Sequence, residues 1–298
     1  MINPPNISQK CNLCENDTFT IISQYNTRWI AQCKKCGLYF LYPVKNEQEE
    51  LKTYTDEQLT HYNKEIFNAA QTRRNIYETE IKTIKNYTSP DAGLLLDIGC
   101  STGFFLKLMH SHGWHNLSGI EISKNAAAVA EKQTNAKIYS KPLKECAFSE
   151  NSFAVITLWD VIDHLLNPKQ ELRIMHQIIK KNGILVIRVR NMNFHMPLIT
   201  HTKWFTDRLK IYPSIIHHYG FNPETLKILL ENSGFTVIKI INSALSKPVL
   251  HHSIMSYVAF YCISGIKNIF YFIFQTICWF SKGKYLFSPS IIIYAQKK

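Results

Sequence analysis

The stretch LLLDIGCSTGFFLKLM, residues 94–109, decides the fold of this chain. Its apolar first part, Leu94–Ile98, predicts a buried strand, and Phe104–His112 resumes with apolar residues at helical spacing. The letters GCSTG between them indicate a backbone turn. A glycine-rich turn that leads from a strand into a helix lies at the carboxyl edge of a sheet, where nucleotide-like ligands bind. The stretch therefore predicts a ligand site built from main chain.

The order of residues in this turn indicates which chemical class of ligand it can bind. The turn reads Asp-x-Gly-x-Ser-x-Gly from Asp97 to Gly103, whereas the dinucleotide fingerprint is Gly-x-Gly-x-x-Gly. Asp97 ends the predicted strand, so its carboxylate would face the ligand and repel a pyrophosphate. We therefore expect a ligand that carries a positive group.

Strands and helices alternate through the rest of the chain. The predicted strands are the segment NLSGIEIS ending near Glu121, then Lys137–Tyr139, the buried run FAVITLWD, Gly183–Val189, the run FTVIKI and the final SIIIYAQKK. The predicted helices are Asn125–Gln133, Pro168–Lys180 and a segment that begins at Pro223 and ends before Gly234. This alternation predicts an α/β domain over residues 91–298, with a parallel sheet covered by helices on both faces.

Length and charge place further limits on the protein. The 298 residues suffice for one large domain and a small one, and the start MINPPNISQKC has no apolar segment typical of a secretory signal, so we expect a cytoplasmic protein. The net charge is +12, and seven lysines but no acidic residue follow Glu231. This imbalance indicates either an anionic partner near the C-terminal end, nucleic acid or a membrane surface, or a solvated lysine-rich face.

The glycine turn resembles motif I of the class I S-adenosylmethionine-dependent methyltransferases, which have a Rossmann-like sheet. In that family the Asp orients the amino group of the methionine moiety, and the glycines let the backbone approach the cofactor. The resemblance implies those roles for Asp97, Gly99 and Gly103, with Cys100 and Ser101 in the same turn. Ser101 stands where the family usually has glycine.

An acidic residue after the next strand extends the resemblance. Glu121 follows Asp97 by 24 residues and ends its strand, where an acidic side chain can accept hydrogen bonds from both ribose hydroxyls. The resemblance implies that Ile122 packs against the adenine. The alternative for Glu121 is an exposed residue at a strand end with no role.

Two later stretches are also similar to the family. NSFAVITLWDVIDHLLNP resembles the family's pattern SFDVVTLWDVLEHLPDP, which implies that Trp159 and Asp160 lie at the methyl-bearing end of the cofactor, with Asp163 and His164 just beyond. HHYGFNPETLKILLENSGF resembles HLYHFSPETLRRLLERAGF; it keeps His217, and Gly220 replaces a second histidine.

The histidines in these stretches are candidate general bases. Methyl transfer from a sulfonium is an in-line displacement that mainly requires alignment, but a hydroxyl acceptor must also lose a proton. His164 and His217, with Asp163 beside them, are the candidates for that step. The alternative for each histidine is a helix cap or a core residue whose hydrogen bonds are satisfied.

Four of the eight cysteines form two Cys-x-x-Cys pairs near the N-terminus. Cys11, Cys14, Cys33 and Cys36 have the spacing of a tetrahedral zinc site, with 18 residues between the pairs and Gly37 after the second pair. Four free thiols are the alternative. Residues 1–45 are thus a predicted zinc ribbon, which resembles the front of bacterial methyltransferases that act on sugars, surface glycans and natural products. We expect this ribbon to shape the acceptor side of the enzyme without a catalytic role.

Two further segments frame the predicted domain. Residues 46–90 have the charge and apolar spacing of a helical lid. An apolar helical insertion lies at about 250–282, and its core, 254–280, is interrupted by Lys267 and Asn268 and is too short to span a bilayer. An interfacial helix at the inner face of the membrane, suited to a lipid-linked acceptor, is one interpretation. Packing against the sheet, the lid or a second subunit in a homodimer is the other.

The sequence thus predicts an S-adenosylmethionine-dependent methyltransferase that contains zinc and acts on a small-molecule or glycan hydroxyl. An RNA methyltransferase is the first alternative, and salt-dependent RNA binding would favour it. A non-catalytic scaffold that binds a partner protein is the second, and failure to bind S-adenosylmethionine would favour it.

Overall fold

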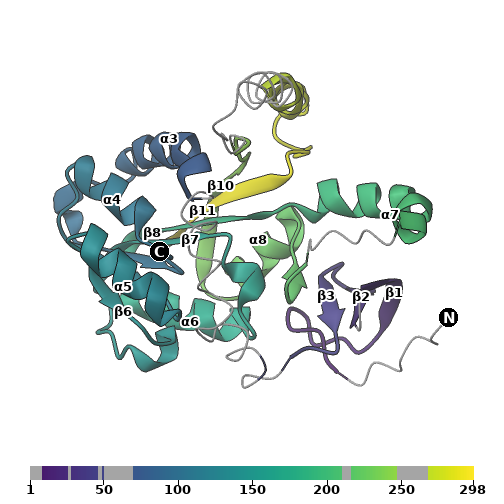
Figure 1. Ribbon diagram of the computed structural model, residues 1–298, viewed down its shortest axis with the longest axis horizontal. Helices are drawn as coiled ribbons and strands as arrows, with labels where there is room; N and C mark the ends of the chain where they lie inside the picture. The colour runs from purple at the N-terminus through teal and green to yellow at the C-terminus, as the bar shows by residue number, and fades with distance from the viewer. Residues whose placement is uncertain (1–8, 26–27, 46–48, 50–69, 210–215, 247–267) are drawn as a thin grey trace.

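The computed structural model describes residues 9–25, 28–45, 49, 70–209, 216–246 and 268–298 (Figure 1). The predicted lid at 46–90 is therefore described mainly by its last helix, α3 (Arg74–Lys85). The predicted insertion at 250–282 is described from residue 268 onward, and residues 268–280 are helical.

A seven-stranded sheet forms the centre of the molecule, in the order β10-β11-β8-β7-β4-β5-β6. The strands are β4 (Leu94–Ile98), β5 (Leu117–Ile120), β6 (Lys137–Tyr139), β7 (Phe153–Trp159), β8 (Ile179–Arg190), β10 (Phe235–Asn242) and β11 (Ser290–Lys297). Strands β4 to β8 pair in parallel, so β4 and β7 lie side by side and their carboxyl ends share one edge.

The sheet is mixed, whereas the alternation of elements predicted a parallel one. Strand β11 lies between β8 and β10 and is antiparallel to both. A strand that is covered on both faces is a continuous apolar run whatever its direction. Residues 290–295 of β11 are all buried, so their sequence carries no information about direction.

Helices cover both faces of the sheet, as predicted. One apolar core contains buried residues of α3, of α4 (Phe104–Ser111) and of α5 (Lys124–Gln133). The other contains buried residues of α6 (Pro168–Ile178) and α8 (Pro223–Glu231) together with the N-terminal ribbon. Helix α8 begins as its sequence predicts, with Pro223 in the first turn and Asn222 accepting a hydrogen bond from the Thr225 amide.

The N-terminal ribbon is a small antiparallel sheet that takes its last strand from the large domain. Strands β1 (Phe19–Tyr25), β2 (Arg28–Cys33) and β3 (Tyr39–Tyr42) are joined by β9 (Tyr219–Gly220), which pairs with β3. A Cβ at Gly220 would lie 2.9 Å from the Met192 side chain and 3.1 Å from the Tyr39 Cβ. This close approach explains why glycine replaces the family's histidine at position 220.

Helix α3 and residues 268–280 differ in how deeply they pack. Ile76, Ile81 and Ile84 of α3 are fully buried, so this part of the predicted lid belongs to the core. Residues 268–280 keep many apolar side chains exposed at the periphery of the molecule (Figure 1). Among the described residues, no helix is both long and apolar enough to cross a bilayer.

Candidate active site and zinc centre

The turn between β4 and α4 needs residues that tolerate unusual backbone angles. Gly99 has a φ of 72°, and a Cβ there would lie 2.5 Å from the Val161 side chain. Ser101 has a φ of 51°, in the left-handed region that favours glycine. This explains why relatives usually have glycine at position 101, and it shows that the serine adopts the same turn.

Asp97 lies at the end of β4 and is buried beneath this turn. Its Oδ1 accepts a 2.6 Å hydrogen bond from the Thr157 hydroxyl of the neighbouring strand β7. Burial raises the pKa of Asp97 to about 8, although the Thr157 hydroxyl acts in the opposite direction. A positive group bound at this carboxyl would offset the desolvation of its charged form.

Glu121 connects the turn to the loop after β5. Its two carboxylate oxygens accept hydrogen bonds from the amides of Ser101 at 2.9 Å and Ser123 at 2.8 Å. Burial raises the pKa of Glu121, and these amides lower it. Each oxygen retains a second acceptor position, which a ligand hydroxyl can use. Ile122 beside it is partly exposed, whereas Cys100 is buried.

Several buried polar atoms around this edge have no hydrogen-bond partner in the described part of the chain. They are Oγ of Ser101, Oγ1 of Thr102, Nε1 of Trp159, Oδ1 of Asp160 and Oδ1 of Asp163. Buried polar groups are normally paired, so a cluster of orphans at one sheet edge indicates a polar ligand. The carboxylates, amides and orphans together fit S-adenosylmethionine, which carries an amino group, ribose hydroxyls and a sulfonium.

The residues at the end of β7 divide between the core and an ionic cluster. The Trp159 ring packs against Tyr77 of α3 and Phe105 of α4, with centroid distances of 5.1 and 4.9 Å. Asp160 forms a 3.1 Å ion pair with Arg73 and a short hydrogen bond with Arg188. Burial acts to raise the pKa of Asp160, but the neighbouring arginines hold it below its usual value. Asp160 is therefore ionised and binds the guanidinium groups of both Arg73 and Arg188.

Asp163, His164 and His217, the residues that the sequence offered as candidates for proton transfer, lie together. Their ligand atoms lie within 4.8 Å of one another, and the two imidazole rings are stacked with centroids 3.6 Å apart. Burial, with His164 nearby, lowers the pKa of His217 to about 4. Arg190 Nη2 lies 2.5 Å from His217 Nε2, and because arginine can only donate, this nitrogen accepts.

This trio has the donor set of a metal site, but its surroundings suit proton transfer better. The Arg190 guanidinium donates a hydrogen bond to Nε2 of His217. It therefore places a positive charge where a metal cation would bind. Asp163 is buried, whereas His164 and His217 are both partly exposed.

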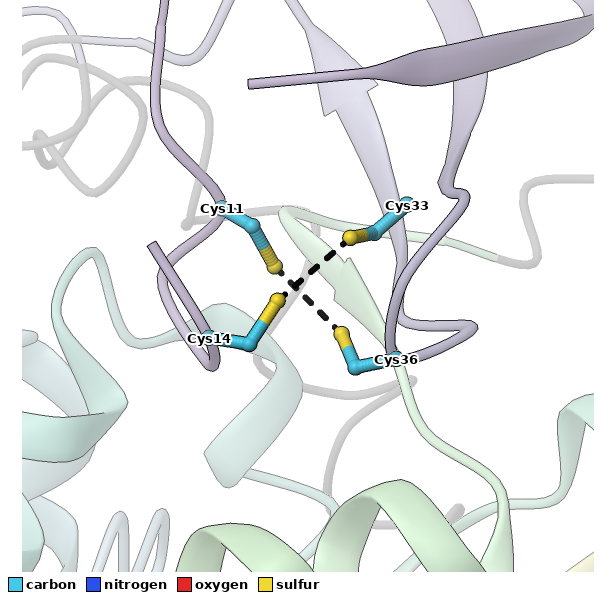
Figure 2. Close-up of side chains that lie close together, drawn as sticks. All are labelled: Cys11, Cys14, Cys33 and Cys36. Carbon is cyan, nitrogen blue, oxygen red and sulfur yellow. Dashed lines mark hydrogen bonds between the residues drawn. The ribbon is translucent and has the colours of Figure 1, made fainter. Parts of the chain in front are cut away.

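Four thiols of the ribbon converge on one point (Figure 2). Sγ of Cys11 lies 3.5 Å from that of Cys36, and Sγ of Cys14 lies 3.6 Å from that of Cys33. A tetrahedron with Zn–S bonds of 2.3 Å has sulfur atoms roughly 3.8 Å apart. The cluster is therefore compatible with zinc.

The two Cys-x-x-Cys turns have matching backbone geometry. Glu15 and Gly37, which follow the second cysteine of each pair, have φ values of 59° and 78°. Their amides donate to the carbonyls of Cys11 and Cys33, at 2.8 and 2.9 Å. Both turns thus present their thiols in the same manner. Gly37 stands at the second of these positions, where its φ of 78° lies in the left-handed region that favours glycine.

Backbone hydrogen bonds connect the ribbon to the histidine pair. The Leu41 amide of β3 donates to the carbonyl of His218 at 3.0 Å, and the His218 amide donates to the carbonyl of Asp163 at 3.0 Å. Arg28 of β2 donates to the carbonyl of His217 at 3.4 Å. The ribbon therefore holds the segment that carries His217 against the segment that carries His164.

A cavity of about 620 Å³ lies beside Asp160. Arg73, Arg188 and Arg190 line it, and none of them was predicted from the sequence as a site residue. The letters IRVR at 187–190 offered one clue, because two arginines alternate at the end of an otherwise apolar strand. Arg73 offered none, since it lies in a charged segment far from the motifs.

The fold and the site together define a class I S-adenosylmethionine-dependent methyltransferase. The model of the family described as methyltransferase domain matches residues 70–240, more than half of the chain, and the protein belongs to this family.

Curated relatives match part of the chain. An uncharacterised protein of Methanocaldococcus jannaschii is 29% identical over 164 residues, which are 54% of this chain and 60% of that protein. The ubiquinone biosynthesis O-methyltransferase of Coxiella burnetii is 22% identical over 174 residues, 55% of this chain and 73% of the relative.

Solved structures share the fold at low identity. A S-adenosylmethionine-dependent methyltransferase of Thermotoga maritima, described as a possible histamine N-methyltransferase, has a TM-score of 0.52 and 16% identity, and covers 80% of this chain and 98% of its own. Phosphoethanolamine N-methyltransferase 2 of Haemonchus contortus, in complex with phosphomonomethylethanolamine and S-adenosylhomocysteine, has a TM-score of 0.55 and 20% identity, over 86% of this chain and 62% of its own.

Proposed function

We propose that the protein transfers a methyl group from S-adenosylmethionine to a hydroxyl of a small-molecule or glycan acceptor. The observation that carries this proposal is the position of the cavity. Its wall contains Asp160, which directly follows β7, and Arg190, whose side chain contacts His217. An acceptor in this cavity would lie between the predicted methyl donor and a base.

The cofactor supplies a methyl group on a positively charged sulfur, and the residues of the site orient it. We propose that Asp97 binds the amino group and that Glu121 binds the ribose hydroxyls. The turn at Gly99, Cys100, Ser101 and Gly103 would present its backbone, with Ile122 against the adenine and Trp159 and Asp160 near the methyl-bearing end. The buried orphan atoms of Ser101 and Thr102 support this arrangement.

We propose His164 as the general base, with His217 and Asp163 as positioning residues. His217 Nε2 accepts a hydrogen bond from Arg190, so it cannot take a proton from the methyl acceptor at that atom. Its ring stacks on His164 and fixes the orientation of that ring. The name of the Coxiella relative, an O-methyltransferase, supports oxygen as the acceptor atom.

We therefore expect His164→Ala to slow the transfer step without loss of cofactor affinity. General-base catalysis contributes about 10²–10⁴-fold, so kcat should fall by about that factor. The measurement is release of S-adenosylhomocysteine with a series of hydroxylated acceptors, followed by mass spectrometry to localise the methyl group.

A matched comparison is His217→Ala, for which we expect a smaller loss of kcat and a shifted pH profile. If the His164 variant retains wild-type turnover, or if the methyl group is found on nitrogen or carbon, the proposal of hydroxyl methylation with this base is wrong.

The size of the cavity, about 620 Å³, supports a small acceptor over RNA. The RNA alternative makes a separate prediction, which is strong binding that weakens steeply with salt.

We further propose that residues 268–280 rest on an anionic lipid surface. The exposed apolar side chains on or just after this helix are Ile269, Phe270, Phe272, Ile273, Ile277, Trp279, Phe280, Tyr285 and Phe287. Lys282 and Lys284 follow the helix directly. Aromatic side chains at the interface, combined with lysines, are typical of peripheral membrane attachment.

We expect the protein to cosediment with vesicles that contain phosphatidylglycerol more strongly than with pure phosphatidylcholine. Trp279→Ser should weaken this binding by about tenfold, because burial of such a side chain contributes about 1.5–3 kcal/mol. Ile228→Ser on α8, which removes another exposed apolar residue, is the matched control and should change nothing. The proposal is wrong if the Trp279 variant binds vesicles as well as the wild type does. It is also wrong if the protein is a dimer that the Trp279 substitution dissociates, because this face would then contact a second subunit.

A further inference from the structure

The cavity beside the cofactor site carries an excess of positive charge. Three of its lining residues are arginines, Arg73, Arg188 and Arg190, and Asp160 is the one carboxylate among the lining residues that the structure describes. Arg73 and Arg188 share the same Asp160 oxygen, Oδ2. The Asp160 carboxylate therefore forms ion pairs with two guanidinium groups.

The third guanidinium, Arg190, is held differently. Its Nη2 contacts His217 Nε2, and with a pKa of about 4 this imidazole is neutral at pH 7. Asp163 also acts electrostatically on Arg190, but burial raises the pKa of Asp163. His195, another lining residue, contacts the Pro289 carbonyl at 2.9 Å, and its pKa is lowered by burial. Among the lining residues that the structure describes, three guanidinium groups therefore face one carboxylate.

The opposite part of the wall is aromatic. Phe194 of α7 (Met192–Leu209) lies 5.8 Å from Phe274, centroid to centroid, and Phe274 lies 6.2 Å from Phe270. All three line the cavity. A ligand that fits this cavity therefore has an acidic group at one end and an apolar or aromatic body at the other.

We infer that the methyl acceptor is an acid, a carboxylate or a phosphate ester, whose anionic group is bound by Arg190 and whose apolar body packs on the phenylalanines. Arginine binds both acids through two parallel hydrogen bonds, which fixes the orientation as well as the position of the ligand. This inference rests on the proposed function, because it names the class of acceptor for the same site. It also gives Arg190 a double role, since the same side chain orients His217.

The inference predicts selective binding of simple aromatic acids. The protein is first saturated with S-adenosylhomocysteine, and phenylacetate, phenyl phosphate and the neutral phenylacetamide are then titrated by calorimetry. We expect at least one of the two anions to bind about tenfold or more tightly than the amide, because a charge-assisted pair contributes about 1.5–3 kcal/mol. The better of the two anions identifies the acidic group of the acceptor.

Variants test the role of Arg190. Arg190→Gln should weaken binding of the anion by about tenfold or more and leave binding of the amide unchanged, while Arg190→Lys should retain part of the affinity. Arg173→Gln, an exposed arginine on α6, is the matched control and should bind the anion like the wild type. The unfolding midpoint and the affinity for S-adenosylhomocysteine of each variant verify that it is folded.

Three results would overturn the inference. These are equal affinity for the amide and the anions, absence of binding by both anions, and binding of the anions only when S-adenosylhomocysteine is left out. In the last case the arginines would serve the carboxylate of the cofactor itself. Failure of hydroxyl methylation is a separate result, since anion binding is measured without turnover.

Discussion

Cys33→Ser is expected to eliminate stoichiometric zinc and to unfold the ribbon. Structural zinc sites in small domains contribute about 10–16 kcal/mol of apparent binding free energy at pH 7, and that energy is folding energy. Cys33 ends β2 and its thiol faces Cys14, so a serine there removes one of the four ligands at the point where the thiols converge (Figure 2).

The loss should extend to catalysis. Strand β3 of the ribbon pairs with β9, and its Leu41 amide binds the carbonyl of His218. Without the ribbon, the segment that carries His217 loses these partners, and its ring no longer has a fixed position against His164. We expect kcat to fall by about 10²-fold or more, because small displacements of positioned groups have effects of that size.

The measurements are zinc content per chain, hydrogen exchange across residues 28–42 and 216–221, and turnover. Cys278→Ser, which removes a partly exposed thiol outside the cluster, is the control and should keep its zinc. One zinc ion per chain in the Cys33 variant, with unchanged hydrogen exchange, would refute the assignment of the metal site.

Asp97→Asn is expected to weaken binding of S-adenosylmethionine and to stabilise the protein when no ligand is bound. A hydrogen bond to a charged group contributes about 1.5–3 kcal/mol, so the dissociation constant should rise by about 10–100-fold. Asparagine retains an oxygen that can accept from Thr157 but cannot offer a negative charge to the amino group of the cofactor.

The pH dependence of this effect has a definite sign. Burial raises the pKa of Asp97 to about 8 in the folded state, above its value of about 4 in an unfolded chain. The folded protein therefore binds the proton more tightly, and the free energy of unfolding decreases as pH rises from about 4 to about 8. Only the carboxylate binds the cation well, so the wild-type affinity should decrease by up to about tenfold for each pH unit below 8.

The Asn variant should lack both trends. Calorimetric titration with S-adenosylmethionine between pH 6.5 and 8.5, together with thermal unfolding of the unliganded protein, measures them. Asp91→Asn, an exposed residue just before β4, is the control. If the Asp97 variant and the wild type bind S-adenosylmethionine equally well, the assignment of Asp97 as the partner of the cofactor's amino group is wrong.

The motifs placed candidate site residues at strand ends, and parallel strands bring their carboxyl ends to a common edge. Asp97 and Thr157 are 60 residues apart, yet register places them side by side. Asp163, His164 and His217, which were named as candidates separately, also lie together. The sequence could not show which of the two histidines is the better candidate for the base, because it does not show that Arg190 donates a hydrogen bond to Nε2 of His217.

The sequence by itself determined the class of protein, the cysteine cluster and the central strands with their helices. Each depends on local features: a glycine turn, a Cys-x-x-Cys spacing and a period of apolar residues. The direction of β11, the strand that residues 219–220 add to the ribbon, and the arginine-lined cavity were decided by tertiary structure alone. In each of these cases the deciding contacts join segments far apart in the chain, and such contacts leave no periodic pattern in either segment.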